Sequence, residues 1–269
     1  MLIGVAGWPV AHSRSPQMHN AALRALGLEE WLYTRLPLAP ERFEESVKAL
    51  AASGYRGINV TIPHKEAALA LAGSATPAAR AIGAANTLTF GDDGIEAENT
   101  DAQGFLDALG RPVEGMRALI LGAGGAARAV AWALREAGAA EVSVWNRTPE
   151  RAQRLALELG VRALRRAEPA DVLVNATSVG LHGSAVDLPL SDVGDPELVA
   201  DLVYGADPPP FSAWAIARGT PLVDGLELLV RQGALSFVRW TGKDAPLDVM
   251  REAVRASSGR PGMRVRFRH

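Results

Sequence analysis

Leu119-Ile120-Leu121-Gly122-Ala123-Gly124-Gly125-Ala126-Ala127 is the stretch that decides the fold of the second half of this chain. An apolar run passes through the pattern G-x-G-x-x-A into an alanine-rich segment, which is typical of a strand, a tight turn and a helix that binds a dinucleotide. Gly122 would make the turn, and Gly124 would let backbone amides approach a pyrophosphate at the positive end of the helix. The residues expected to contact the cofactor here are Gly122, Ala123, Gly124, Gly125 and Ala126. A glycine turn that binds no ligand is the alternative.

The next apolar run, Val142–Trp145, ends in cationic and hydroxyl side chains. The candidates for binding the cofactor's ribose are Asn146, Arg147, Thr148 and Arg151. An NAD site usually places an acidic residue at this strand end, about 20 residues after the first glycine, whereas guanidiniums suit a 2′-phosphate. Glu150 is the counter-argument, but a carboxylate in the first turn of a helix is explained by the helix dipole. The sequence therefore predicts NADP as the cofactor.

On both sides of this stretch, short apolar runs alternate with segments of helical period, as in parallel βαβ units. The predicted fold class is α/β. The expected strands are Leu2–Ala6, Leu32–Leu36, Gly57–Val60, Asn86–Phe90, Ile95–Glu98, Ala118–Leu121, Val142–Trp145, Val172–Asn175, Leu198–Asp201 and Pro221–Val223. The main expected helices are Gln17–Leu26, Glu41–Ser53, Lys65–Leu71, Pro77–Ile82, Ala102–Leu109, the segment after Gly124 up to Ala137, Leu226–Trp240 and Pro246–Ser257.

A length of 269 residues is consistent with two domains. We expect an N-terminal α/β domain over residues 1–101 and a doubly wound, Rossmann-type domain over residues 102–236, with a cleft between them. The turn Gly110-Arg111-Pro112 marks the passage into the second domain. The C-terminal helices, at about 237–269, are expected to pack back on the first domain.

The composition excludes several classes of function. A net charge of -2 gives no overall field that would recruit nucleic acid, and the basic tail Arg260–His269 is expected to be a frayed terminus. The absence of cysteine excludes disulfides, iron–sulfur clusters and a thiol nucleophile, and the five histidines show no metal-ligand spacing. The apolar runs are interrupted by charge and glycine, and the first residues lack a signal pattern. We therefore expect a cytoplasmic protein with no metal and no membrane partner.

Polar residues gather at the predicted strand ends of the first domain, where an open parallel sheet presents its ligand-binding groups. The hydroxyls in His12–Pro16 could cap the next helix or hold an anion. Asn59–Lys65 places an amide, a hydroxyl and an amine after a buried strand, which packing does not explain. Gly83–Thr87 and Asn99–Gly104 add a further amide and a carboxylate.

Lysine is rare in this chain. Only Lys48, Lys65 and Lys243 are lysines among 28 basic residues, so a lysine retained in a polar segment could mark a need for an ammonium that can release its proton. A GC-rich genome is the plainer explanation of the bias.

Together these segments resemble the shikimate dehydrogenase family, NADP-dependent enzymes that interconvert 3-dehydroshikimate and shikimate in aromatic amino-acid biosynthesis. The matching motifs are S-x-S-P at Ser13–Pro16, N-V-T-x-P-x-K at Asn59–Lys65, G-A-x-N-T at Gly83–Thr87, N-T-D-x-x-G at Asn99–Gly104, G-A-G-G-A at Gly122–Ala126, N-R-T at Asn146–Thr148 and N-A-T-S-x-G at Asn175–Gly180, with Gly225 and Gln232 beyond them. They occur in the family's order. One departure is Leu228, where the family commonly has Met.

The resemblance implies a role for each matching residue. Ser13 and Ser15 would bind the substrate carboxylate with Tyr204 nearby, and the side chains that would bind the ring hydroxyls are Asn59, Thr61, Asn86 and Gln232. Lys65 and Asp101 would form the catalytic pair. Thr177, Leu202 and Gly225 would contact the cofactor. A homodimer is a further expectation at the level of the family.

Oxidation of a secondary alcohol requires a base within hydrogen-bond reach of the hydroxyl, and a lysine could take that proton while an aspartate orients it. Whether Lys65 transfers the proton or only anchors the substrate, with Asp101 or water acting as the base, stays open at this point. Structural alternatives also stay open: Asp101 or Ser15 could be helix caps, and Asn175–Ser178 could be a plain loop.

Two other functions compete with this one. A quinate/shikimate dehydrogenase that prefers NAD would be expected to carry an acidic residue at the strand end, where this chain has Asn146-Arg147-Thr148. A non-catalytic ligand sensor on the same fold would be expected to lack Lys65, Asp101 or the glycine turn, and all three are present.

Overall fold

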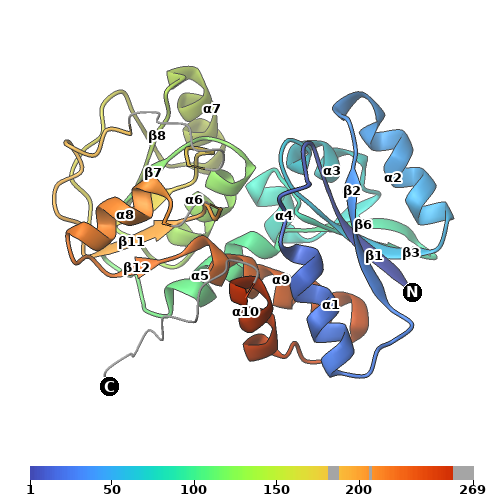
Figure 1. Cartoon of the computed structure of the whole chain (residues 1–269). Helices are drawn as coiled ribbons and strands as arrows, with labels where there is room; N and C mark the ends of the chain where they lie inside the picture. The colour runs from blue at the N-terminus through green and yellow to red at the C-terminus, as the bar shows by residue number, and fades with distance from the viewer. Residues whose placement is uncertain (181–187, 206–207, 257–269) are drawn as a thin grey trace.

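The computed structural model describes residues 1–180, 188–205 and 208–256. These residues form two lobes, each built on a six-stranded sheet, and Figure 1 shows helices α5 (Thr100–Leu109) and α9 (Gly225–Thr241) lying between them. We call the lobe with the N-terminal sheet the first lobe and the other the second lobe. The tail Arg260–His269, expected to be frayed, lies outside the described residues.

The sheet of the first lobe has the order β2-β1-β3-β5-β6-β4. Its strands are β1 (Leu2–Gly7), β2 (Leu32–Pro37), β3 (Tyr55–Val60), β4 (Ser74–Ala75), β5 (Thr87–Gly91) and β6 (Gly94–Glu98). Strand β1 runs parallel to β2 and β3, and β5 pairs with β3 and β6 in the antiparallel direction. The predicted hairpin thus lies inside a mixed sheet, between β3 and the short edge strand β4.

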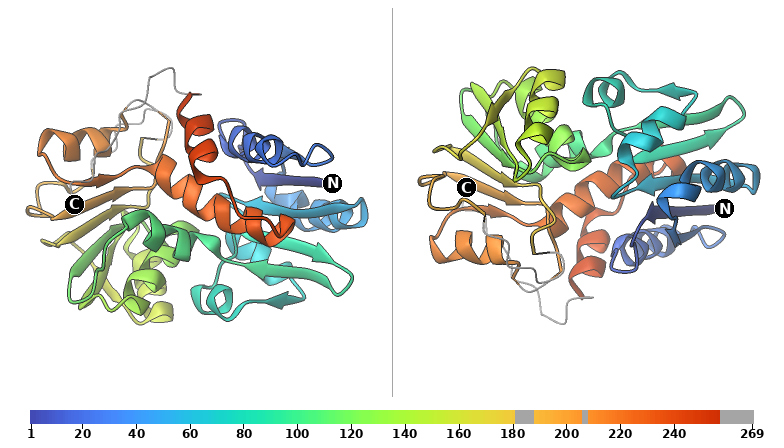
Figure 2. Two further views of the ribbon diagram at one scale, coloured as in Figure 1. Left: turned by 90° about the horizontal axis from the view of Figure 1, so that it is seen from below. Right: turned by 90° about the horizontal axis from the view of Figure 1, so that it is seen from above.

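Helices cover both faces of this sheet because residues along its strands point to opposite faces in alternation. Ile3 and Val5 of β1 pack in one apolar cluster with α1 (Ser15–Ala25), α9 and α10 (Leu247–Ala256). Ala6, with Ile58 and Val60 of β3, packs in another with α2 (Phe43–Ala52) and α3 (Lys65–Leu71). The shorter helices of this lobe are η1 (Pro40–Arg42) and α4 (Pro77–Ile82). The two views of Figure 2 place α9 and α10 at the junction of the lobes.

The second sheet has the order β12-β11-β10-β7-β8-β9, and all of its strand pairs are parallel. Its strands are β7 (Arg117–Leu121), β8 (Glu141–Trp145), β9 (Arg162–Leu164), β10 (Val172–Asn175), β11 (Leu198–Asp201) and β12 (Leu222–Val223). Helices α6 (Gly125–Glu136) and α7 (Pro149–Leu159) cover one face, and α8 (Pro210–Ala217) covers the other. The strand order reverses at β7 and β10, and ligands of such sheets bind beyond that point.

The α/β fold class is confirmed, and several elements match their predicted bounds, among them Lys65–Leu71 and Val172–Asn175. The prediction did not include strands β4 and β9, which are too short to display an alternating pattern. Among the described residues, no helix is both long enough and apolar enough to cross a lipid bilayer.

Candidate functional site

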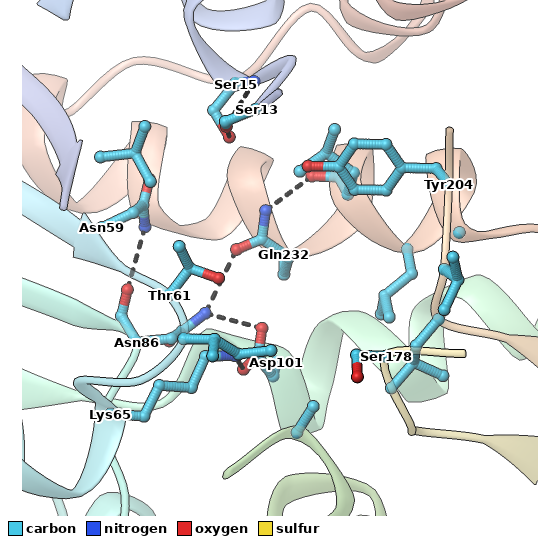
Figure 3. Close-up of a pocket in the computed structure, with 18 of the residues that line it drawn as sticks. Ser13, Ser15, Asn59, Thr61, Lys65, Asn86, Asp101, Ser178, Tyr204 and Gln232 are labelled. Atoms are coloured by element: carbon cyan, nitrogen blue, oxygen red, sulfur yellow. Dashed lines mark hydrogen bonds and ion pairs between the residues drawn. The ribbon is translucent and has the colours of Figure 1, made fainter. Parts of the chain in front are cut away.

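A pocket of about 350 Å³, which we call the first pocket, lies between the two lobes. Figure 3 shows side chains from both lobes pointing into it. All nine residues expected to bind substrate or to carry the chemistry line it: Ser13, Ser15, Asn59, Thr61, Lys65, Asn86, Asp101, Tyr204 and Gln232. Four of the expected cofactor residues line it as well: Ala126, Thr177, Leu202 and Gly225. Sequence positions more than 200 residues apart therefore meet at one cavity.

Lys65 and Asp101 form an ion pair in this pocket. Lys65 is the first residue of α3, and its Nζ lies 2.5 Å from Oδ2 of Asp101 in the first turn of α5. Each side chain is only 13% exposed, so water screens the pair weakly. Asn99 caps α5, because its Oδ1 accepts hydrogen bonds from the backbone N–H groups of Asp101 and Ala102. The alternative that Asp101 is merely the helix cap is wrong, and its carboxylate is available to the pocket.

Asn86 connects the ion pair to the rest of the pocket. Its Oδ1 accepts the backbone N–H of Thr100 at 2.7 Å, which fixes the amide so that Nδ2 is the donor toward the cavity. Nδ2 then donates to Oδ1 of Asp101 at 2.8 Å and to Oε1 of Gln232 at 3.2 Å (Figure 3). Asn86 is 2% exposed, so these bonds form away from bulk water. The two carboxylate oxygens of Asp101 are thus shared between Lys65 and Asn86.

Asn59 is held from behind by a tyrosine that the sequence analysis did not identify. The buried hydroxyl of Tyr33 donates to Oδ1 of Asn59 at 2.8 Å, and Asn59 Nδ2 donates to Oγ1 of Thr87 at 3.1 Å. Burial raises the pKa of Tyr33 well above its usual value, so this hydroxyl stays a hydrogen-bond donor at neutral pH. Thr87 belongs to the matched motif G-A-x-N-T, but no sequence signal marks Tyr33 as a support for the site.

Ser13, Ser15 and Tyr204 gather at one end of the first pocket. Ser13 Oγ donates to Ser15 Oγ at 3.2 Å, and the guanidinium of Arg35 holds the Ser13 carbonyl at 2.7 Å. Helix α1 begins at Ser15 without a side-chain cap, so the cap alternative for Ser15 is wrong. Burial raises the pKa of Tyr204, opposed by hydrogen bonds to the Ser13 side chain and the Arg14 backbone. Three hydroxyls therefore converge where an anionic group could be bound.

A second pocket of about 460 Å³ lies beyond the strand ends of the second sheet. It is lined by Gly122, Ala123, Gly124, Gly125, Asn146, Arg147, Thr148, Arg151 and Thr177, all of them expected cofactor residues. Lys65 and Thr177 line both pockets. The two cavities therefore meet at the lysine of the ion pair.

The glycine turn of the second pocket has the shape that a dinucleotide requires. Gly122 has φ +115°, and a Cβ there would meet the carbonyl oxygen of Ala176 at 2.7 Å, so only glycine fits. A Cβ on Gly124 would meet no atom within 4 Å, so open space stands over the backbone where α6 begins. No acidic residue occupies the first turn of α6, so the positive end of the helix is uncompensated. These residues fit a pyrophosphate.

Two exposed guanidiniums border the same pocket. In the described part of the chain, Arg147 and Arg151 have no carboxylate within ion-pair distance. Asn146 is oriented by a hydrogen bond from its Nδ2 to the Thr148 carbonyl at 2.9 Å. Glu150, the counter-argument to NADP, is exposed in the first turn of α7 and is absent from the lining of this pocket. The charge that faces the pocket at this strand end is therefore positive.

Asn175–Ser178 is more than a plain loop. Asn175 Oδ1 accepts hydrogen bonds from the backbone N–H and the hydroxyl of Thr177, and its Nδ2 donates to Oδ1 of buried Asp201 at 2.9 Å. Asp201 also accepts the hydroxyl of Ser212 at 2.7 Å. Burial raises the pKa of Asp201, although these hydrogen bonds oppose that rise. The network fixes Thr177 where the two pockets meet.

Other lining residues were absent from the predicted site. They include Trp8, Ile62, Ser178 and Leu228 in the first pocket. Ser178 and Leu228 fall in or beside matched motifs, whereas Trp8 and Ile62 are exposed apolar residues that no pattern singles out. Within residues 1–180, 188–205 and 208–256, no group of three or more His, Asp or Glu side chains is arranged to hold a metal ion.

Three family models match this chain. Residues 5–88 match the shikimate dehydrogenase substrate binding domain, residues 107–181 match shikimate / quinate 5-dehydrogenase, and residues 225–255 match the shikimate 5'-dehydrogenase C-terminal domain. The matched segments lie in both lobes and include helix α9.

Curated relatives and solved structures agree with these models. The shikimate dehydrogenase (NADP(+)) of Methanopyrus kandleri is 43% identical, with 94% of each chain covered, and that of Anaeromyxobacter sp. strain Fw109-5 is 46% identical, with 95% of this chain and 96% of the relative covered. The crystal structure of shikimate 5-dehydrogenase from Thermus thermophilus in complex with NADP(H) and shikimate has a TM-score of 0.86 at 45% identity, covering 96% of this chain and 99% of that one. The resemblance carried by the motifs is confirmed, and the chain belongs to the shikimate dehydrogenase family.

Proposed function

We propose that this protein catalyses the reversible, NADP-dependent oxidation of shikimate to 3-dehydroshikimate. The observation that carries the proposal is the buried Lys65–Asp101 ion pair, whose lysine lines both the first and the second pocket. A group that handles the proton of an alcohol must lie where substrate and cofactor meet, and Lys65 occupies that position.

The first pocket is the proposed substrate site. Ser13, Ser15 and Tyr204 supply hydroxyls for the carboxylate of shikimate, which is its only charged group. The amide and hydroxyl groups proposed to bind the ring hydroxyls are those of Asn59, Thr61, Asn86 and Gln232. Most of these side chains are already held by hydrogen bonds, so little conformational freedom is lost when substrate binds.

Lys65 is the proposed proton carrier. As the substrate is oxidised, the Lys65 amine accepts the hydroxyl proton, and in the reverse direction its ammonium donates that proton to the carbonyl oxygen. Asp101 keeps Nζ in place through the 2.5 Å contact, and Asn86 fixes the other carboxylate oxygen. The lysine charge also stabilises negative charge that develops on the substrate oxygen during reduction.

The second pocket is the proposed NADP site. NADP, when bound, supplies the acceptor for the hydride that leaves the substrate carbon. The glycine turn from Gly122 to Gly125 would hold the pyrophosphate, and Arg147, Thr148 and Arg151 would hold the 2′-phosphate. Thr177, Leu202 and Gly225 would contact the nicotinamide end, since they line the first pocket.

Three expectations from the sequence belong to the same proposal. We propose a substrate-binding catalytic domain over residues 1–101 with the C-terminal helices from about residue 237, and an NADP-binding domain over residues 102–236, a boundary that falls inside α9. We also propose a cytoplasmic location and a homodimer. Light scattering of the purified protein tests the dimer directly.

The assay that tests the function follows absorbance at 340 nm as the purified protein oxidises shikimate. We expect NADP reduction with shikimate, and far slower reduction with NAD or with quinate. The guanidiniums at the strand end support the preference for NADP. Preference for NAD or quinate would instead select the broader dehydrogenase, and cofactor binding without turnover would select the ligand sensor.

A further inference from the structure

Arg128 is a buried charge that belongs to neither pocket. Its side chain is only 9% exposed, although it lies on α6, one residue beyond the glycine-rich stretch Gly122–Ala127. Burial of a guanidinium is costly unless its donors are satisfied, so an arginine here needs a structural or functional reason. Its contacts show that it joins the two lobes.

The guanidinium of Arg128 contacts both lobes. In the second lobe, Nη1 pairs with Glu158 of α7 at 2.5 Å. In the first lobe, Nε donates to the carbonyl of Ile82, the last residue of α4, at 2.6 Å. Gly83 caps α4 with φ +74°, and a Cβ on it would lie 2.4 Å from Nη2 of Arg128. The arginine thus packs directly on the turn that ends α4.

That turn leads straight into the active site. Ala85 donates its N–H to the carbonyl of Lys65 at 2.9 Å, and the Asn86 carbonyl accepts the N–H of Val60 at 2.8 Å. Residues 82–86 are therefore bonded to Arg128 at one end and to the site at the other. A shift at Ile82 would move Asn86, which holds Asp101.

Helix α6 also reaches the catalytic lysine itself. A Cβ on Gly125 would lie 3.1 Å from Cβ and Cδ of Lys65, so the aliphatic part of the lysine packs on the first residue of α6. Arg128 follows Gly125 by about one helical turn. The proposed cofactor helix thus touches the site twice, through Gly125 at Lys65 and through Arg128 at the turn before Asn86.

From these contacts we infer that Arg128 is a positioning residue, which holds the 82–86 turn and so sets Asn86 and Lys65 in register with the cofactor helix. The inference rests on the proposed function. The planar guanidinium of Arg128 holds several N–H donors in a fixed arrangement and donates to Glu158 and to the Ile82 carbonyl at the same time. A lysine ammonium reproduces this arrangement poorly. An error of about 1 Å in such a site can lower turnover about 100-fold.

The first test compares Gly83→Ala with Gly110→Ala. Both glycines cap a helix in the left-handed region, with φ +74° and φ +62°, so both variants carry the same kind of backbone strain. Only at Gly83 does the new Cβ meet the guanidinium, since nothing lies within 4 Å of a Cβ on Gly110. We expect kcat for shikimate oxidation to fall about 10-fold or more in Gly83→Ala and less than about 2-fold in Gly110→Ala.

The second test compares Arg128→Met with Glu158→Gln. Methionine keeps the packing but removes the bond to Ile82, whereas Glu158→Gln leaves that bond in place. We expect Arg128→Met to lower kcat about 10- to 100-fold, with the Kd for NADP within about 2-fold, and Arg128→Lys to recover part of the loss. Hydrogen exchange at residues 82–86 should accelerate in Arg128→Met and stay unchanged in Glu158→Gln.

Folded Arg128→Met with unchanged kcat and only a lower melting temperature would overturn the inference. If Arg128→Met does not fold, the comparison of Gly83→Ala with Gly110→Ala tests the inference instead. Equal kcat values in these two variants would overturn the inference. The unmodified enzyme separates this inference from the proposed function. Its failure to reduce NADP with shikimate would overturn the function, whereas the inference fails when that enzyme is active and the variants match their controls.

Discussion

The first and the second pocket are built in different ways. In the first, buried amides, hydroxyls and one ion pair are fixed by hydrogen bonds to one another, as in the contacts of Asn86 with Asp101 and Gln232. In the second, the polar groups include the backbone of a glycine turn that is exposed at Gly124 and two surface guanidiniums, Arg147 and Arg151. One pocket therefore relies on geometry, and the other relies on charge and open space.

This difference separates the expected consequences of mutation. Interactions between fixed, desolvated groups depend steeply on position, and removal of one partner leaves the other buried without compensation. Interactions of an exposed cation with a phosphate tolerate small shifts but are screened by salt. Substitutions in the first pocket should therefore change kcat, and substitutions in the second should change cofactor affinity and its salt dependence.

The largest expected effect is that of Lys65→Met. Methionine has a similar length but carries no proton, so we expect kcat for shikimate oxidation to fall about 1,000-fold. Asp101 keeps its bond from Asn86, so the carboxylate stays in place while the amine is removed. Steady-state kinetics at saturating NADP measures the effect. Lys243→Met is the matched control, because Lys243 is exposed and outside both pockets.

Near-normal turnover in Lys65→Met would overturn the role of Lys65 as proton carrier and would favour Asp101 or water as the base. That outcome would also weaken the expected difference between the pockets, because the position of the lysine amine in the first pocket would then have little effect on kcat. A loss of equal size in Lys243→Met would point to a general defect of the protein.

A smaller effect is expected when both guanidiniums of the second pocket are removed. Arg147→Ala combined with Arg151→Ala should raise the Kd for NADP about 10- to 100-fold, because both guanidiniums are exposed to water and we expect the two together to contribute about 1.5–3 kcal/mol. The Kd for NAD, which has no 2′-phosphate, should change less than about 2-fold. Titration at low and high salt should show a strong salt dependence for the unmodified protein and a weak one for the variant.

Equal losses for NADP and NAD in the double variant would contradict a 2′-phosphate site at this strand end. Arg154→Ala combined with Arg165→Ala serves as the control, because it removes the same charge from residues outside both pockets.

The residues of the second pocket could be predicted from the sequence, although many of them lie on the surface and are not held by side-chain packing. Its residues come from consecutive strand ends of a parallel sheet, and this topology places them together whatever the side-chain packing is. The tight turn at Gly122 depends on a local backbone conformation that only glycine adopts easily, so the glycine pattern predicts it directly. Local signals of this kind are readable from one sequence.

The supports of the first pocket were not predictable in the same way. Tyr33 and Arg128 act through tertiary contacts, with Asn59 and with Ile82, between segments that no local pattern connects. A tyrosine in a strand and an arginine in a helix look like ordinary packing and surface residues in the sequence. Motif matching recovered Asn59 and Asn86, but it recovered neither Tyr33, which bonds to Asn59, nor Arg128, which bonds to the turn before Asn86.

Behind the first pocket lies one more buried group, His19, which supplies the smallest of the expected effects. Its ring stacks on Tyr33 with 4.2 Å between centroids, it is 0% exposed, and neither ring nitrogen has a hydrogen-bond partner among the described residues. Burial lowers the pKa of His19 from 6.5 to about 3. Because this ring supports the side of the first pocket that carries Asn59, the scaffold there should respond to mild acid.

The sign of that response follows from linkage. Below pH 6.5 the unfolded chain binds a proton at His19 that the folded protein refuses, so stability is lost as the pH falls from 6.5 toward about 3. Between pH 7.5 and 5.5 the unmodified protein should lose about 1.4 kcal/mol more of its unfolding free energy than His19→Phe does. Urea unfolding at the two pH values measures this difference.

Any packing change caused by phenylalanine has the same effect on the unfolding free energy at both pH values, so it cancels in the comparison. The contribution of His64, whose pKa burial also lowers, cancels as well because His64 is present in both proteins. If the unfolding free energy falls equally in the two proteins, His19 takes up its proton in the folded state. The stacked rings of His19 and Tyr33 behind Asn59 would then be accessible to water, as the second pocket is.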